Sequence, residues 1–163
     1  MTVTMLRRPE VVDPIVTEAF EARLWGRLVR PSDADYDETR QLQNKFHEGH
    51  PAYIVRVGDV ADVIHTVNFA RENDLPLTVR SGGHSIPGYS MAEGSVVVDM
   101  SGMKKVSVDL KKRTLTAQPG ATTADVLAVA EPHGLGLSTG DTSSVGLGGL
   151  TTGGGIGFLV RKF

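Results

Sequence analysis

Glycines gather in two stretches of the chain, and this distribution restricts the fold more than any other feature of the sequence. Ten of the 19 glycines lie in residues 134–160, where Asp141 is the only charged side chain. A smaller cluster spans Arg80 to Gly88. Leucine, valine, isoleucine and phenylalanine alternate with the glycines of the longer stretch, a pattern that is not typical of a flexible linker. The composition indicates backbone that is tightly folded and partly buried.

Two kinds of structure require glycine at this density. Tight turns at the rim of a β-structure need residues with positive φ, and a nucleotide cradle needs backbone N–H groups that approach phosphate oxygens without an intervening Cβ. The spacing of the glycines alone leaves both interpretations open.

The N-terminal part of the chain carries helical patterns. Asp13 and Pro14 predict the start of a helix of about four turns, whose apolar positions recur every four residues as Val16, Phe20, Leu24 and Leu28. Residues 36–46 predict a weaker helical stretch. We expect residues 1–48 to be a helical lead-in and residues 49–163 to form the main domain.

A βαβ unit is predicted next. Residues 53–57 are β-branched and aromatic, which favours a strand, and Asp59 precedes a helix that ends near Asn73. The apolar positions of this helix follow a 3.6-residue period: Val60, Val63, Ile64, Val67 and Ala70. Residues 77–80 predict the second strand, so the glycine pair before His84 lies at a strand's carboxyl end, where ligand-binding loops occur in such sheets.

The remaining elements predict a mixed α+β fold. Residues 95–99 predict a strand, and residues 105–109 and 114–118 predict a β-hairpin joined by a charged turn. A short helix from Thr122 or Thr123 to Glu131 then leads into the longer glycine stretch.

Composition excludes several classes of partner and site. The net charge of −2 gives no electrostatic footprint for nucleic acid, and the absence of cysteine excludes disulfides and thiolate chemistry. No window approaches the roughly 18 apolar residues of a membrane span, and no apolar segment follows the N-terminal arginines. We therefore expect a cytoplasmic protein that binds neither nucleic acid nor membrane.

The common nucleotide motifs are not satisfied. A Walker A loop is excluded because the sequence contains no Gly-Lys pair, and neither Gly146-Leu-Gly148 nor Gly155-Ile-Gly157 has glycine or alanine three residues further on. Ser138 lies in a Gly-x-Ser-x-Gly pattern, but no histidine follows His133 to complete a hydrolase triad, so we interpret it as a loop residue.

Three other histidines receive structural interpretations. His47 and His50 are spaced to share a metal ion, yet no third ligand is in reach in the sequence, so we expect a solvated loop and no metal site. His65 occupies a polar position of its predicted helix and is expected to face solvent.

Taken together, the segments Arg80-Ser-Gly-Gly-His84-Ser-Ile-Pro-Gly88 and Gly140 to Gly157 resemble the two flavin-contacting segments of the PCMH-type FAD-linked oxidases, which include the berberine-bridge-enzyme-like oxidases. The resemblance runs from about Tyr36 to the last residue. It implies a PCMH-like FAD-binding domain of two small α/β lobes that ends before the family's substrate domain. The family's catalytic base would then lie beyond residue 163, and no catalytic residue is assigned.

The resemblance also implies FAD as cofactor and His84 as its covalent attachment point through an 8α-N-histidyl bond. A neutral imidazole nitrogen is a competent nucleophile, and the bond would hold the flavin and raise its oxidising power. Bicovalent members of the family carry cysteine where this chain has Thr142, so the attachment here would involve His84 alone. The implied cofactor contacts are Arg80, Ser81, Gly82, Gly83, His84, Ser85, Gly88, Gly120, Thr139, Gly140, Asp141, Thr142, Val145, Gly146, Gly149, Gly153, Gly154, Gly155, Ile156 and Gly157.

The activity implied is oxidation of a small molecule at an alcohol, amine or sugar carbon, with hydride transfer to the flavin and molecular oxygen as acceptor. Two alternatives stay open on the sequence: a non-catalytic flavin-binding module, and an inactive truncated fragment that holds no cofactor well.

Overall fold

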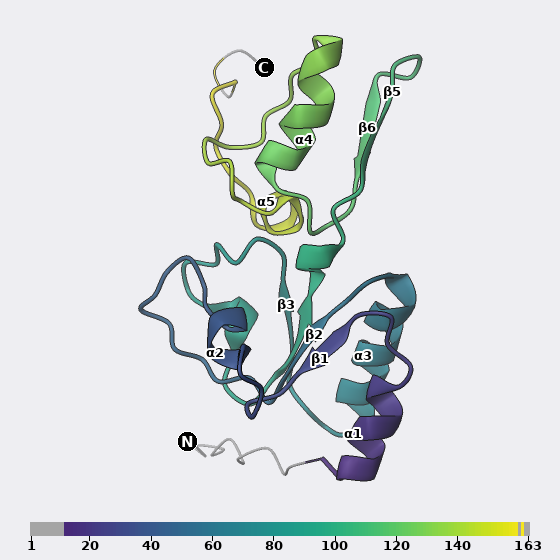
Figure 1. Cartoon of the computed structure of the whole chain (residues 1–163). Helices are drawn as coiled ribbons and strands as arrows, with labels where there is room; N and C mark the ends of the chain where they lie inside the picture. The colour runs from purple at the N-terminus through teal and green to yellow at the C-terminus, as the bar shows by residue number, and fades with distance from the viewer. Residues whose placement is uncertain (1–11, 160, 162–163) are drawn as a thin grey trace, which may run out of the picture.

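Four strands form the sheet of the first lobe, in the order β1-β2-β4-β3 (Figure 1). β2 (Tyr53–Arg56), β4 (Val96–Asp99) and β3 (Leu77–Arg80) run parallel, and β1 (Arg27–Val29) pairs antiparallel with β2 at one edge. The structure is a computed structural model that describes residues 12–159 and 161. Within it the βαβ unit predicted from the sequence is confirmed, and β4 is inserted between its two strands.

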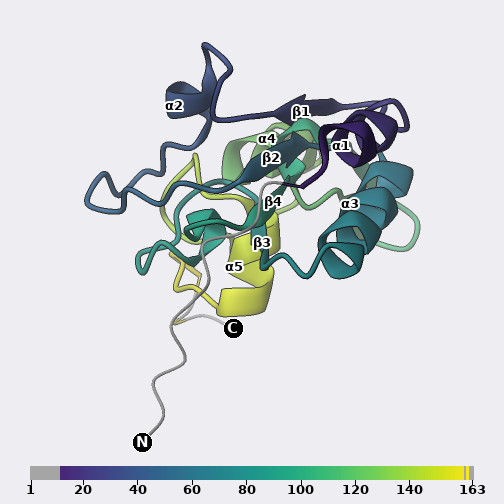
Figure 2. The ribbon, with the colours of Figure 1, turned by 90° about the horizontal axis from the view of Figure 1, so that it is seen from below.

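Two hydrophobic clusters cover the two faces of this sheet. On one face α1 (Pro14–Glu21) and α3 (Val60–Glu72) pack on Val96 and Val98, and the rings of Phe20 and Phe69 stack at 4.1 Å. The opposite face buries Val97 against Tyr36 of α2 (Tyr36–Thr39) and Met91 of the 3₁₀ turn η1 (Tyr89–Met91). Figure 2 shows α1 and α3 side by side, with α2 away from them. Burial on both faces explains the unbroken valine run of β4.

The second lobe follows η2 (Met100–Gly102) and lies beyond the carboxyl ends of the parallel strands (Figure 1). It contains the hairpin β5 (Val106–Asp109) and β6 (Thr114–Ala117), the helix α4 (Thr123–Ala130), the 3₁₀ turn η3 (Glu131–His133) and the helix α5 (Leu147–Gly153). Thr122 and Asp125 form a capping box at the start of α4. The α+β fold of two small lobes is therefore confirmed.

The first predicted helix is wrong in its length. α1 ends at Glu21, and Leu28, expected on its apolar face, is a buried residue of β1. The chain must turn at Gly26, where an added Cβ would overlap the Arg56 carbonyl oxygen of the neighbouring strand. Pairing of β1 with β2 thus overrides the helical period. The second helical stretch, predicted over 36–46, ends at Thr39.

The predicted helix at 60–72 is present, and Val63 and Ala70 of its apolar period face the core, but the rest of the buried face is different. Val60, Ile64 and Val67 are exposed, whereas Asp62 and Thr66 are fully buried together with Phe69 and Ala70. The cause is Asp62, whose carboxylate accepts hydrogen bonds from the backbone N–H groups of Trp25, Gly26 and Gly58 and turns that side of α3 inward.

Candidate flavin site

The first glycine segment is a loop that leaves the carboxyl end of β3. Gly83 and Gly88 have φ of 72° and 75°, a left-handed backbone that favours glycine. Behind the loop, Gln43 N donates to Gly83 O at 3.0 Å, and the side chains of Asn44 and His47 both contact Ile86 O. Residues 43–46, predicted as the end of a helical stretch, and His47, predicted in a solvated loop, therefore brace the glycine loop from outside.

Arg80 anchors the start of the same loop. Its Nη1 donates to Thr39 O at 2.6 Å and lies 3.6 Å from the buried carboxylate of Asp99, which also lies 3.9 Å from Arg56 Nε. Asp99 is the end of the central strand, and the register places Arg56 and Arg80 on either side of it. Among the described residues, Arg80 Nε and Asp99 Oδ2 are buried without a hydrogen-bond partner. Arg80 is thus a structural support under the loop.

The second glycine segment is held by the start of α4 and by the turn before it. Thr123 N donates to Val145 O at 2.9 Å, Leu147 N donates to Ala121 O at 2.7 Å, and Gly148 N donates to Pro119 O at 3.2 Å. These bonds place α5, a helix that was not predicted from the sequence, beside the first segment.

The two segments cross at a pair of glycines, one from each lobe. A Cβ added to Gly82 would overlap Gly146 N, and a Cβ added to Gly146 would overlap Gly82 N and Ser81 Oγ. Ser81 Oγ also donates to Pro119 O at 2.6 Å across the lobes. Since Gly146 has an ordinary φ of −74°, close backbone approach is what requires glycine at this position.

A cavity of about 1010 Å³ lies beside this crossing, at the upper end of the sizes usual for ligand pockets. Both glycine segments line it, so the structure brings together parts of the chain that the sequence only suggested were related. Half of the predicted cofactor-binding residues line the cavity: Ser81, Gly82, Gly83, His84, Ser85, Val145, Gly146, Gly149, Gly153 and Gly154.

The other predicted residues lie outside the lining of this cavity. Arg80, Gly88 and Gly120 support the backbone, Gly120 because an added Cβ would overlap Met100 O. Thr139 is buried and its carbonyl accepts from Thr123 Oγ1, while the Thr142 hydroxyl donates to Asp141 at 3.0 Å. Gly157 packs near Ser138 and Gly140, and Ile156 is exposed. Whether any of them contacts a bound cofactor stays a prediction.

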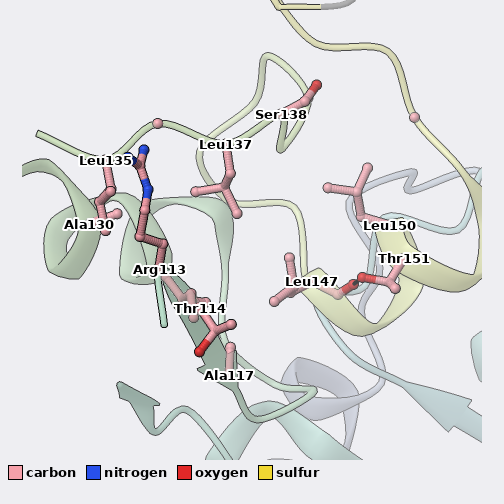
Figure 3. Close-up of a pocket in the computed structure, with 14 residues that line it drawn as sticks. Arg113, Thr114, Ala117, Ala130, Leu135, Leu137, Ser138, Leu147, Leu150 and Thr151 are labelled. Atoms are coloured by element: carbon pink, nitrogen blue, oxygen red, sulfur yellow. Dashed lines mark hydrogen bonds between the residues drawn. The ribbon is translucent and has the colours of Figure 1, made fainter. Parts of the chain in front are cut away.

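Gly140 and Gly155 line a second cavity, of about 750 Å³, in the second lobe. Figure 3 shows its wall of Leu135, Leu137, Leu147 and Leu150, with Arg113 and Thr114 on the hairpin side. Ser138 also lines this second cavity, and Leu150 borders both cavities.

The lining of the cavity beside the glycine crossing includes residues that the sequence did not single out. Leu77, Val79, Ile86 and Tyr89 form an exposed apolar wall at the free edge of β3. Ser90 also lines the cavity, and its buried Oγ has no hydrogen-bond partner in the described part of the chain. The position of β3 at the sheet edge exposes this wall, and strand order cannot be read from the sequence alone.

His84 is part-buried and lines the cavity, and its Nε2 lies 2.9 Å from Ser144 Oγ of the other lobe. The two histidines considered for a metal site have different partners. The His47 ring contacts Ile86 O, and His50 Nδ1 lies 3.4 Å from Glu93. No group of three metal-ligating side chains occurs among residues 12–159 and 161, and no helix in that part is long and apolar enough to cross a membrane.

Comparison with known proteins places this geometry in a family. The FAD binding domain family matches residues 51–163, a span that contains both glycine segments. The chain belongs to this family. The match agrees with the resemblance seen in the sequence and with the two-lobed fold.

Individual relatives are FAD-linked oxidoreductases. The chain is 38% identical over 141 residues to the uncharacterized FAD-linked oxidoreductase YgaK of Bacillus subtilis, covering 86% of this chain and 31% of the relative. It is 32% identical over 138 residues to (R)-6-hydroxynicotine oxidase of Paenarthrobacter nicotinovorans, covering 85% and 30%. The structure of wild-type BBE-like 1 of Physcomitrella patens aligns with a TM-score of 0.84 at 30% identity, over 90% of this chain and 32% of that one. The chain thus spans about a third of their length.

The residues at the cavity fit FAD. In α5, Gly149 and Gly153 are one turn apart and line the cavity, and a Cβ added to either would meet no protein atom within 4 Å. Protein packing therefore does not explain these two glycines, whereas a ligand lying on the helix does. The apolar wall on β3 and the unpartnered Ser90 hydroxyl suit a ligand with both aromatic and polar parts.

Proposed function

We propose that this chain is the FAD-binding part of a flavin-dependent oxidase and that its FAD is linked covalently to His84. The observation that carries the proposal is that His84 and the bare glycine face of α5, which come from different lobes, line one cavity. FAD would supply the hydride acceptor, and the protein would supply its placement. Gly149 and Gly153 would let the cofactor approach the backbone of α5 closely, and His84 would act as its tether.

The reaction that fits this family is oxidation of a small molecule at an alcohol, amine or sugar carbon, with hydride transfer to the flavin and electrons passed to oxygen. One relative is named an oxidase of 6-hydroxynicotine, which supports an amine among these three. We assign no catalytic base to the residues of this chain.

The test is the visible spectrum of the purified protein before and after denaturation in detergent. We expect a flavin spectrum that stays with the polypeptide in both conditions, and His84→Ala should bind flavin that separates on denaturation. His133→Ala is the control, because His133 is exposed and lies outside the cavity lining.

Each other outcome points to a different function. Flavin that separates from the wild type on denaturation would contradict the tether to His84 and leave a flavin-binding protein. A colourless protein that does not take up added FAD would contradict cofactor binding altogether. Flavin that stays bound but is not reduced by any alcohol, amine or sugar would favour a non-catalytic flavin-binding module.

A further inference from the structure

His84 makes one side-chain hydrogen bond within the described part of the chain, and its partner is Ser144. The two residues are 60 apart in the sequence and belong to different lobes, and His84 Nε2 lies 2.9 Å from Ser144 Oγ. The bond therefore forms only when the two lobes are together.

Backbone contacts fix both ends of this bond. Next to Ser144, Ala124 N donates to Ser143 O at 3.0 Å and Thr123 N donates to Val145 O at 2.9 Å. Next to His84, Gln43 N donates to Gly83 O at 3.0 Å. The backbone on which each of the two side chains stands is therefore held by contacts of the fold.

A neutral imidazole carries its proton on one nitrogen and its lone pair on the other, and the hydrogen bond of one nitrogen selects between the two tautomers. Ser144 Oγ lies 2.9 Å from Nε2 and so occupies the hydrogen-bonding position of that nitrogen. Nδ1 has no hydrogen-bond partner among the residues that the structure describes. A tautomer with the lone pair on Nε2 would direct the nucleophilic electrons at the serine hydroxyl.

We propose that Ser144 Oγ accepts a hydrogen bond from Nε2–H of His84 and thereby keeps the lone pair on Nδ1. Ser144 is then a positioning residue, which acts on the cofactor through His84 and does not touch the reacting atoms. This inference rests on the proposed linkage of FAD to His84.

The first experiment reads the tautomer directly in the complete gene product, prepared without flavin and labelled with ¹⁵N-histidine. Long-range ¹H–¹⁵N correlation spectra show which nitrogen of His84 carries the proton, and His84→Gln assigns the signals. We expect Nε2–H in the wild type. Ser144→Ala should shift the tautomer ratio toward Nδ1–H by roughly three- to tenfold, the range that one hydrogen bond supports.

Two variants separate the hydroxyl group from general effects on the loop. Ser144→Thr keeps a hydroxyl and should retain the wild-type tautomer. Ser143→Ala removes a neighbouring exposed hydroxyl that makes no side-chain hydrogen bond to His84, and it should also behave as the wild type. Equal thermal melting of Ser143→Ala and Ser144→Ala checks that the fold is unchanged.

The second experiment measures the rate of flavin attachment when FAD is added to the same apoproteins, from fluorescence that stays with the denatured polypeptide. Ser144→Ala should attach flavin more slowly, in proportion to the fraction of the Nε2–H tautomer that it loses, while Ser144→Thr and Ser143→Ala match the wild type. An Nδ1–H tautomer in the wild type, or an unchanged tautomer or attachment rate in Ser144→Ala, would overturn the proposal. Wild-type flavin that never attaches contradicts the tether instead, and the tautomer spectra then decide the role of Ser144 by themselves.

Discussion

At the scale of single residues, the buried carboxylate of Asp62 joins three parts of the first lobe. It accepts hydrogen bonds from Gly58 N at 2.7 Å and from Trp25 N and Gly26 N at 2.9 Å. Burial acts to raise the pKa of Asp62, but the backbone N–H groups of Gly58, Trp25 and Gly26 outweigh it and hold the pKa below its ordinary value. The ionised form is therefore the one that stabilises the fold.

We predict that Asp62→Ala lowers the free energy of unfolding by roughly 3 kcal/mol at neutral pH, because it leaves buried N–H groups without an acceptor. The sign of the pH dependence follows from the lowered pKa. The stabilisation is present above the unfolded carboxyl pKa of about 4 and is lost as the pH falls toward the folded value. Denaturant titrations of wild type and variant across this range measure the difference.

The exposed Glu72 on the same helix supplies the control. Glu72→Ala should change the unfolding free energy by less than about 0.5 kcal/mol. A wild-type advantage over Asp62→Ala that persists unchanged at acid pH would show that the carboxylate charge is not the cause.

At this scale the sequence predicts the position of a residue where a local motif marks it. The glycine pair before His84 and the strand before the pair suffice to place His84 at a sheet's carboxyl edge, and the structure puts it at the cavity. Asp62 and Ser144 were missed because their partners lie far away in the chain, Trp25 for the first and His84 for the second. Nothing in the local sequence distinguishes such residues from solvated ones.

At the scale of elements, α5 shows how tertiary contacts create a helix from a poor helical sequence. Glycine is about 1 kcal/mol less favourable than alanine inside a helix, so the sequence around Gly149 gave no helical signal. The first turn forms because Leu147 N and Gly148 N are bound by carbonyls of the turn before α4. The helix predicted from the apolar period of residues 14–28 is shorter for the opposite reason, because Arg27–Val29 pair with β2 as a strand.

We predict opposite effects of Gly149→Ala on stability and on cofactor binding. The added Cβ meets no protein atom within 4 Å, so the apoprotein should gain up to about 1 kcal/mol from helix propensity. The same Cβ projects into the cavity, so affinity for FAD should fall roughly tenfold or more through overpacking. Thermal unfolding of the apoprotein and titration with FAD measure the two effects.

Gly136→Ala is the control for the effect of Gly149→Ala on FAD affinity. Gly136 also has open space around an added Cβ, but it lines the second cavity and not the one beside His84. Its FAD affinity should equal that of the wild type. Equal loss of affinity in both variants would mean that the face of α5 is not where the flavin lies.

At the scale of the whole molecule, the cavity exists because the lobes meet at the Gly82 and Gly146 backbones. The sequence predicted elements of both lobes, but not β1 or α5, and it showed the glycine density of both segments. It could not predict which glycine serves packing and which serves a ligand, because that distinction depends on what lies opposite each Cβ. Gly82 and Gly146 face backbone of the other lobe, whereas Gly149 and Gly153 face open space.

We predict that Gly146→Ala separates the lobes at this crossing. Its φ of −74° is accessible to alanine, so any loss comes from overlap of the new Cβ with Gly82 N and Ser81 Oγ. The unfolding free energy should fall by about 1–3 kcal/mol. Amide hydrogen exchange should become faster in residues 81–85 and 142–148, and stay unchanged in β2 and β4, which do not touch the crossing.

A second substitution tests whether the new Cβ at residue 146 is opposed by the Gly82 backbone or by the Ser81 side chain. Ser81→Ala combined with Gly146→Ala removes the serine oxygen but leaves Gly82 N in place, so it should not restore stability or exchange protection. Recovery in the double variant would assign the close contact to the Ser81 hydroxyl alone. An alanine at residue 146 also narrows the cavity, so it would affect FAD binding as well as the contact between the lobes. Stability and hydrogen exchange of the variants are therefore compared on the apoprotein, where only the contact between the lobes changes them.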